Sequence, residues 1–312
     1  MDQSVILSIG TLCFDVIGTV DGAIPQSSIT ARLKHLRYED GGRAANFTVY
    51  AAMMGARPAI VARVGKDFRD GGYWHRLRGM GVNVDLLYHQ MDTLTPRTFI
   101  YSNPQDMTLY FYPAFENGAH EEGFVKYTET LVRTAAHDAV YATSETPEAN
   151  LVALASSAAR LKVFAPAHDI GRHSVSQLSE ALGAADWLIA NQIELEMLCK
   201  LIEKRPDEIV QSFGLQVLAA TAGAAGVDLL TPGGTVHLAA YHPRTVADPT
   251  GAGDAFAGAL VAEYLTNGDL VRSARTATAL ASFVVEQIGC QIDPPAPQEI
   301  ADREKEISSG SA

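Results

Sequence analysis

The sequence is poor in cysteine and tryptophan, and it has no apolar run long enough to cross a membrane. Its 312 residues include three cysteines, at positions 13, 199 and 290, and two tryptophans. An odd number of cysteines without a CxxC pair indicates neither a disulfide framework nor a zinc site, and it fits the reducing cytoplasm. The N-terminal apolar run has an acidic start and contains Asp15, so we expect strands there rather than a signal peptide. No stretch approaches about 18 consecutive apolar residues, so we expect no membrane partner.

Basic residues are also scarce. The chain has 24 lysines and arginines against 36 aspartates and glutamates, which gives a formal net charge of −12. A protein that binds nucleic acid needs a basic surface, so we expect no nucleic-acid partner. A phosphate ligand remains compatible with this charge, because main-chain amides at the start of a helix bind anions. The length suits one large α/β domain with a small appendage.

What the chain does contain is an alternation of apolar strands and helices. The expected strands are 5–9, 58–64, 139–142, 162–165, 187–190, 217–220, 227–230 and 236–239, and the expected helices are 43–54, 68–79, 121–135, 147–160, 174–183, 193–201, 252–267 and 270–289. Strands that alternate with long helices form βαβ units. We therefore predict an α/β fold in three layers, with a mostly parallel central sheet covered on both faces.

Two segments depart from this alternation. Residues 12–40 and 94–115 are rich in strand-forming residues and have no helical stretch between the strands. The runs 95–101 and 107–113 flank a segment with turn chemistry, which predicts a hairpin. We expect these two segments to form a small β lid on an α/β core made of residues 1–11, 41–93 and 116–306. The last residues, 307–312, are expected to be disordered.

The segment with the clearest chemistry is Asp248-Pro-Thr-Gly-Ala-Gly-Asp-Ala-Phe256, which follows a strand and opens a long helix. Its glycines let the main chain approach a ligand closely. The start of the helix offers unpaired N–H groups and the positive end of a dipole, which suit a phosphate group. Asp254 lies in the first turn, where it could accept a proton from an attacking hydroxyl. Taken alone, a GxGD segment would equally fit a tight turn whose aspartate complements the helix dipole.

A second segment, Gly41-Gly42-Arg43-Ala44-Ala45-Asn46, also joins a loop to a helix. The glycines permit close approach, and the amide of Asn46 offers a donor and an acceptor to neighbouring hydroxyls. The competing interpretation is an ordinary loop-to-helix junction with Asn46 near the N-cap. Asp15 follows the first strand and is either an acceptor-binding carboxylate or a solvated turn residue.

These motifs resemble those of the ribokinase-like (PfkB) family of carbohydrate and nucleoside kinases. The string DPTGAGDAF resembles the C-terminal signature of the family and GGRAAN its N-terminal signature, and VGKDF, NQIE (191–194) and TAGAAG (221–226) follow in the family's order. The resemblance runs from about residue 5 to about residue 300. It implies a ribokinase-like fold and an ATP- and Mg²⁺-dependent transfer of phosphate to a hydroxyl group of a small molecule.

The resemblance also implies roles for single residues. Asp254 would be the catalytic base, and the main chain of Gly251, Ala252 and Gly253 would surround the phosphate in transit. The acceptor would be held by Asp15, Gly41, Gly42 and Asn46.

The nucleotide side of the site is implied in the same way. Asn191 and Glu194 would hold the phosphates, with Glu194 holding Mg²⁺ indirectly. The turn with Thr221, Gly223 and Gly226 would lie near the nucleotide, although a plain hairpin also explains such a turn. Asp248 and the region around Gly289 match a monovalent cation site, which suggests K⁺.

Few residues in the sequence indicate which molecule accepts the phosphate. Pro249 and the run Phe111-Tyr-Pro-Ala-Phe115 resemble the bacterial adenosine-kinase-like branch, which often carries FYPGA there. We therefore expect transfer to a primary hydroxyl of a nucleoside or pentose. The alternative is a kinase for ribose, fructose or a phosphorylated sugar, for which Arg43, Arg63 and Arg97 are candidate phosphate ligands. A non-catalytic protein on a kinase scaffold is a third hypothesis, which the intact GAGD segment disfavours.

The remaining signals are weaker. The nine histidines show no metal-ligand spacing and are expected to be structural or on the surface. An aromatic cluster in the lid is expected to form the lid core or a clasp between two subunits, so a homodimer through the lid is one expectation. This cluster consists of Phe99, Tyr101, Tyr110, Phe111, Tyr112 and Phe115.

Overall fold

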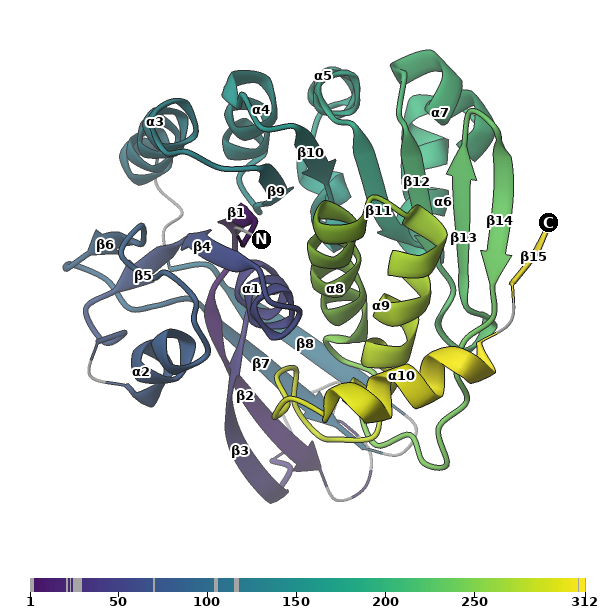
Figure 1. Cartoon of the computed structure of the whole chain (residues 1–312). Helices are drawn as coiled ribbons and strands as arrows, with labels where there is room; N and C mark the ends of the chain where they lie inside the picture. The colour runs from purple at the N-terminus through teal and green to yellow at the C-terminus, as the bar shows by residue number, and fades with distance from the viewer. Residues whose placement is uncertain are drawn as a thin grey trace.

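The protein is built on a nine-stranded central sheet that carries helices on both faces (Figure 1). The computed structural model describes residues 3–20, 22, 24, 30–69, 71–103, 106–114, 118–307 and 309–311. The strand order is β4 (Arg57–Val61), β1 (Val5–Gly10), β9 (Ala139–Thr143), β10 (Leu161–Phe164), β11 (Trp187–Asn191), β12 (Val217–Thr221), β13 (Val227–Thr231), β14 (Gly234–Leu238) and β15 (Ser309–Ser311). The six strands from β4 to β12 pair in parallel, and the last three pair antiparallel. The predicted mostly parallel sheet is confirmed.

The helices form a layer on each face of the sheet. One layer contains α1 (Arg43–Met53), α8 (Ala252–Asn267), α9 (Leu270–Val284) and α10 (Pro297–Glu306), and the other contains α3 (Gly118–Thr134), α4 (Pro147–Ser156), α5 (Val175–Ala184), α6 (Gln192–Ile202) and α7 (Pro206–Phe213). Alternate residues of one strand serve the two layers, as Ile6 packs with the first and Leu7 with the second. Because both faces are covered, the parallel strands are almost wholly apolar.

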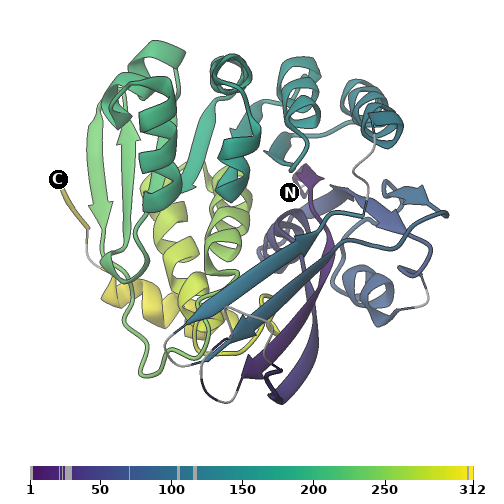
Figure 2. The ribbon, with the colours of Figure 1, turned by 180° about the vertical axis from the view of Figure 1, so that it is seen from behind.

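A four-stranded sheet lies apart from the central sheet, at the lower edge in Figures 1 and 2. Its order is β3 (Leu33–Gly41), β2 (Cys13–Val20), β7 (Arg97–Ser102) and β8 (Met107–Tyr112). We call it the lid sheet, because both segments expected in the lid contribute strands to it. The predicted hairpin is confirmed as β7 and β8, which pair antiparallel. Phe115, and with it the expected boundary between lid and core at 115 and 116, lies outside the described residues.

A short unit lies to one side of the two sheets, at the left in Figure 1. It contains β5 (Arg63–Gly65), which pairs with β6 (Tyr88–Gln90), and α2 (Gly72–Gly79). The strand expected over 58–64 is therefore two strands, because the chain leaves the central sheet at Ala62. The helix expected from residue 68 starts only at Gly72, after an N-cap at Gly71, since adjacent glycines disfavour an earlier helical turn.

Three features of the C-terminal third differ from expectation. Helix α9 ends at Val284 rather than at 289, because the carbonyl of Val285 accepts hydrogen bonds from Ala247 and Asp248. Helix α10 lies where no helix was expected. It begins at Pro297, a position where the missing N–H of proline removes no helical hydrogen bond. The tail expected to be disordered contains β15, whose main chain pairs with β14; residues 308 and 312 lie outside the described residues.

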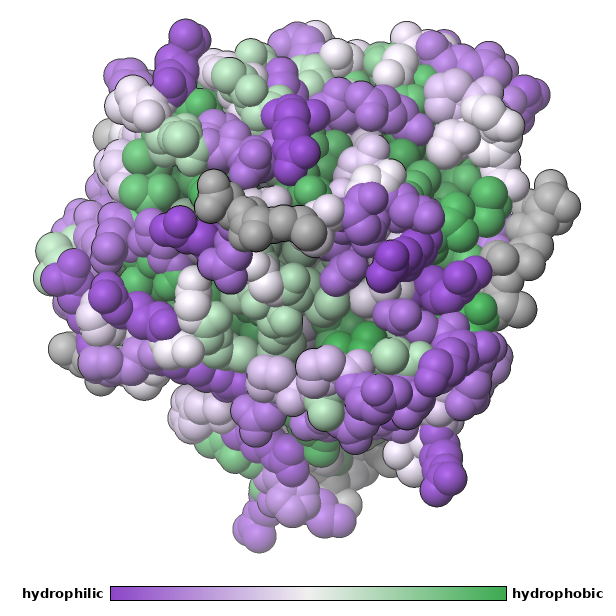
Figure 3. Space-filling model, in the orientation of Figure 1, coloured by the Kyte–Doolittle hydropathy of each residue, from purple (hydrophilic) through white to green (hydrophobic). Residues whose placement is uncertain are grey.

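Hydrophilic side chains spread widely over the face that carries α10, with hydrophobic patches between them (Figure 3). Among the described residues, no helix is both long enough and apolar enough to cross a membrane.

Candidate functional site

A cavity of about 440 Å³ opens where the parallel strands of the central sheet end. The carboxyl ends of β1, β9, β10, β11 and β12 all reach it, and the lid sheet and the start of α8 supply the remaining walls. Crevices at the carboxyl ends of the strands are where open α/β sheets bind ligands. Most residues expected to form the site line this cavity: Asp15, Gly42, Asn46, Asn191, Glu194, Thr221, Gly251, Gly253 and Asp254.

The start of α8 forms one wall of the cavity. Gly251 is the N-cap and has a φ of 83°, which favours glycine, and as a glycine it brings no side chain to cap the helix. A Cβ atom at Gly251 would lie 2.9 Å from the main chain of Cys290, so the turn also has no room for a side chain. The main-chain amides at this helix start can therefore approach an anionic ligand closely, at the positive end of the helix dipole.

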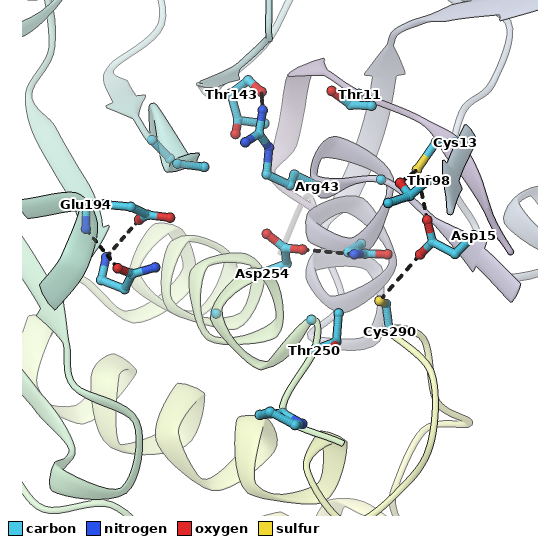
Figure 4. Close-up of a pocket in the computed structure, with 18 of the residues that line it drawn as sticks. Thr11, Cys13, Asp15, Arg43, Thr98, Thr143, Glu194, Thr250, Asp254 and Cys290 are labelled. Carbon is cyan, nitrogen blue, oxygen red and sulfur yellow. Dashed lines mark hydrogen bonds between the residues drawn. The ribbon is translucent and has the colours of Figure 1, made fainter. Parts of the chain in front are cut away.

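Asp254 lies in the first turn of α8, between Glu194 on one side and Asp15 on the other (Figure 4). Its Oδ2 atom accepts a hydrogen bond of 2.8 Å from Nδ2 of Asn46. Burial raises the pKa of Asp254 to about 6, against the lowering effects of the Asn46 hydrogen bond and the charge of Arg43. The negative charges of Glu194 and Asp15 add to the rise. A carboxyl group with this pKa is ionised near neutrality and can accept a proton readily.

The oxygen end of the Asn46 amide, opposite the nitrogen that donates to Asp254, is also hydrogen-bonded. Its Oδ1 atom accepts a hydrogen bond of 3.0 Å from Nε2 of Gln291, which also donates to the hydroxyl of Tyr73 at 2.7 Å. The Tyr73 hydroxyl donates in turn to the carbonyl of Gly41 at 3.0 Å. The acceptor side of the expected site is thus linked to Asp254 through side chains from α1, α2 and the segment after α9.

The diglycine segment shapes the start of α1. Gly42 has a φ of 99°, and a Cβ atom there would lie 2.6 Å from the main chain of Thr11 and Leu12. A Cβ atom at Gly41 would lie 2.2 Å from the carboxylate of Asp15. Both glycines therefore allow the helix start, the lid strand β2 and the end of β1 to meet. The next residue, Arg43, lines the cavity and donates to the carbonyl of Thr143 at 3.2 Å.

Asp15 enters the cavity from the lid sheet between two thiols (Figure 4). The thiol of Cys13 donates to Oδ1 of Asp15 at 3.3 Å, and that of Cys290 lies 3.8 Å from Oδ2. Burial raises the pKa of Asp15, although the hydrogen bonds from Cys13, Thr98 and Cys290 act in the opposite direction. Two of these donors are thiols, which donate weakly, so a ligand hydroxyl would be a stronger partner for Asp15 than either cysteine.

Asn191 and Glu194 form a capping box at the start of α6. The side chain of Asn191 accepts from the amide of Glu194, and the side chain of Glu194 accepts from the amide of Asn191, each at 2.9 Å. Both side chains line the cavity. Among the described residues, no cluster of three His, Cys, Asp or Glu side chains could hold a metal. The side-chain oxygen atoms of Asn191 and Glu194 suit Mg²⁺, which keeps several waters and is commonly bound through one or two carboxylates together with substrate phosphates.

The remaining predicted residues lie near the cavity without lining it. Gly223 and Gly226 shape a turn, with φ values of 54° and 102°, beside Thr221, which does line the cavity. Ala252 is the first residue of α8. The carboxylate of Asp248 accepts from the amides of Thr250 at 2.9 Å and Gly289 at 3.3 Å, so it clamps the loop before α8 to the loop after α9.

Two of the three candidate arginines have structural partners away from the cavity. Arg63 is buried and forms an ion pair of 2.5 Å with Glu145, and Arg97 forms one of 2.5 Å with Asp67. Arg43 alone supplies a cationic side chain among the described residues that line the cavity. Sequence reasoning missed Cys13, Thr98, Cys290 and Gln291, since each is a single residue brought to the site by distant chain segments. The Gly-Cys-Gln segment at 289–291 has no local pattern that would have indicated a role in the site.

The chain is similar to known proteins over nearly its whole length. A model of the family described as pfkB family carbohydrate kinase matches residues 3–297. A nucleoside kinase of Methanothermobacter thermautotrophicus is 29% identical over 304 residues, covering 96% of this chain and 94% of that protein. An ATP-dependent ribose-1-phosphate kinase of Halopiger xanaduensis is 28% identical over 298 residues, with 93% and 95% covered. The crystal structure of a nucleoside kinase of Methanocaldococcus jannaschii superposes with a TM-score of 0.87 at 24% identity, covering 98% of this chain and 100% of that one.

Proposed function

Because the chain belongs to the pfkB family of carbohydrate kinases, we propose that it transfers the γ-phosphate of ATP to a primary hydroxyl of a nucleoside. The observation that carries this proposal is the position of Asp254, in the first turn of a helix whose start has no side-chain cap and faces the cavity. One helix start thus offers a base and main-chain amides to the same reacting centre. Phosphoryl transfer needs mainly positioning and charge stabilisation, which this arrangement supplies.

The proposed reaction uses these residues in a defined order. Asp15 and Asn46 bind hydroxyls of the acceptor, and Asp254 takes the proton of the attacking hydroxyl. A bond forms between the acceptor oxygen and the γ-phosphorus while the bond from that phosphorus to the β-phosphate oxygen breaks, and ADP leaves. The amides of Gly251 and Gly253 stabilise the charge on the transferring group, and that of Ala252 joins them once it leaves the carbonyl of Pro249, to which it donates at 3.3 Å. Asn191 and Glu194 would hold hydrated Mg²⁺ and the phosphates, and Thr221, Gly223 and Gly226 would lie along the nucleotide.

The walls of the cavity favour a nucleoside over a phosphorylated sugar. Ile100, Leu109 and Phe111 line it from the lid sheet and offer an apolar surface that suits a nucleobase. A phosphosugar would need cationic ligands for its phosphate, and Arg63 and Arg97 are engaged elsewhere. A free pentose such as ribose remains the alternative acceptor.

A monovalent cation near Asp248 is a further part of the proposal. The Asp248 carboxylate and the loop around Gly289 lie together, as the resemblance to the family implies. We expect K⁺ to raise turnover by ordering the loops on both sides of the start of α8.

We also propose that two copies of the chain pair through the lid. In the register of the lid sheet, Tyr38, Val16, Phe99 and Tyr110 lie side by side across all four strands, on the face opposite the cavity. Tyr38 is 74% exposed and Tyr110 is 61% exposed. A second copy of the same sheet would cover this aromatic row.

The experiment that tests the acceptor is a panel of nucleosides, free pentoses, hexoses and sugar phosphates, scored by ADP release with ATP and Mg²⁺. We expect the highest kcat/KM with a nucleoside. Turnover with ribose but with no nucleoside would replace the proposed acceptor by the alternative. Turnover of a sugar phosphate alone would contradict the argument from the arginines.

A further inference from the structure

The hydrogen bonds behind Asp254 form a chain with a fixed direction. A main-chain carbonyl only accepts, so the carbonyl of Gly41 requires the Tyr73 hydroxyl to donate its single proton there. The oxygen of Tyr73 must then accept from the nitrogen, not the oxygen, of the Gln291 amide. The same nitrogen donates to Asn46, whose oxygen faces Gln291 and whose nitrogen therefore faces Asp254.

We propose that Gln291 is a positioning residue, which fixes the orientation of the Asn46 amide and thereby keeps an N–H of Asn46 on the carboxylate of Asp254. Gln291 does not line the cavity, so it acts through Asn46 and not on a substrate. Its side chain is 9% exposed, and its own main-chain carbonyl accepts from Arg76 at 2.9 Å, which holds the segment independently of the side chain. The role in turnover, though not the orientation itself, rests on the proposed function of Asp254 as the base.

The orientation matters because the two ends of an amide act oppositely on a carboxylate. An N–H directed at Asp254 stabilises its ionised form, whereas an amide oxygen in the same place would repel it. The hydrogen bond from Asn46 is the largest of the influences that lower the pKa of Asp254. Arg43 of α1 acts in the same direction, and Glu194 of α6 and Asp15 of β2 act against it. Tyr50, Tyr141 and Cys290 also face this region, and burial raises the pKa of each, so they stay uncharged.

The test is a direct titration of Asp254 in the whole protein by NMR with ¹³C-carboxyl-labelled aspartate. Asp254→Asn assigns the signal, which is needed because the pKa of Asp40 is also about 6. In Gln291→Leu the Asn46 amide is free to turn, and we expect the pKa of Asp254 to rise by about one unit, the size of one hydrogen bond to a charged group. In Tyr73→Phe the hydrogen bond to the Gly41 carbonyl, which sets the direction of the chain of hydrogen bonds, is lost. We expect a smaller rise in the pKa of Asp254.

The matched control is Gln90→Leu. Gln90 is 8% exposed, and its Oε1 atom, like that of Gln291, has no hydrogen-bond partner among the described residues. It lies on β6 and not in the chain of hydrogen bonds, so the same substitution should leave the titration of Asp254 unchanged while removing a comparably buried amide. If Gln291→Leu folds poorly, Tyr73→Phe alone still decides the question.

The outcomes separate this inference from the proposed function. An unchanged titration of Asp254 in both Gln291→Leu and Tyr73→Phe would overturn the positioning role, even if the protein phosphorylates nucleosides. A shift that appears equally in Gln90→Leu would reduce it to a general effect of lost stability and would also overturn it. A shift in the pKa of Asp254 that is confined to Gln291→Leu and Tyr73→Phe supports the positioning role. It does so even if the panel of acceptors shows no turnover, because that result would contradict only the proposed function. In an active enzyme, the acid limb of kcat/KM should move with the titration.

Discussion

At the scale of single residues, the proposed chemistry depends on the surroundings of the Asp254 carboxyl group. Burial alone would favour its neutral form, and the hydrogen bond from Asn46 and the charge of Arg43 partly offset that effect. The result is a carboxyl group with a pKa of about 6, close enough to neutrality for proton transfer in either direction.

Asp254→Asn removes the base and keeps the shape of the side chain. We expect kcat with the preferred acceptor to fall by about 10²–10⁴-fold, the usual contribution of a positioned base, with a much smaller change in KM. Steady-state ADP release measures both constants. Asp207→Asn, the same substitution at the exposed surface, serves as control, and an Asp254→Asn enzyme that kept most of its kcat would contradict the assigned role.

The rate should also depend on pH in one direction. Since the base must be ionised, activity is present above the pKa of about 6 and should fall roughly tenfold for each unit below it. A profile of kcat/KM from about pH 5 to pH 8 measures this limb. The residual activity of Asp254→Asn should lack it; a limb that persisted there would have to arise from another group.

At the scale of elements, the site depends on ties between segments that are distant in sequence. Helices α1 and α8 approach closely because Gly258 has no side chain: a Cβ atom there would lie 2.5 Å from the carbonyl of Phe47. This contact brings Asn46 and Asp254 within hydrogen-bonding distance. Glu145 accepts from Thr11 at 2.6 Å and pairs with Arg63, so it links the ends of β1 and β9 to β5.

Glu145→Gln should destabilise the protein by about 3–5 kcal/mol, because it leaves Arg63 buried without a counter-charge. The pKa of Glu145 is lowered to about 2, chiefly by Arg63 against the effect of burial. Its stabilising contribution is therefore present above the unfolded-state pKa of about 4.3 and is lost as the pH falls toward 2. Urea denaturation at neutral pH measures the difference.

The control is Glu129→Gln, the same substitution in the exposed ion pair with Arg133. A surface pair contributes about 0–1 kcal/mol, so this variant should unfold near the parental midpoint. Equal losses in the two variants would show that the buried pair has no special role.

Elements and motifs differed in how far the sequence could predict them. The strands, the long helices and the segments around Gly42 and Asp254 were predictable, because each is a continuous pattern with a local physical cause. The end of α9 was not, since a carbonyl accepting from the distant residues Ala247 and Asp248 sets it. Gln291 was not predictable either, because its partner Asn46 lies 245 positions away. Helix α7 was missed although Pro206 at its start and Gly214 at its end were available as signals.

At the scale of the whole molecule, the aromatic row on the outer face of the lid sheet leads to a prediction about assembly. We expect light scattering to give the mass of a dimer for the parent chain and of a monomer for a variant with Tyr38→Asp and Tyr110→Asp. Val175→Asp alters a side chain that is 51% exposed on α5, outside the lid, and should stay dimeric. A monomeric parent, or a dimer that survives both lid substitutions, would contradict pairing through this face.

The site also draws on both ends of the chain. Asn46 meets Asp254 across 208 positions and Gln291 across 245, and the cavity between them needs strands from the middle of the sequence. During synthesis on the ribosome, the segment with Asn46, which would bind an acceptor, emerges long before the segment with Asp254, which would take its proton. A nascent or prematurely terminated polypeptide ending before α8 would therefore lack both the proposed base, Asp254, and the helix start proposed to hold the phosphate.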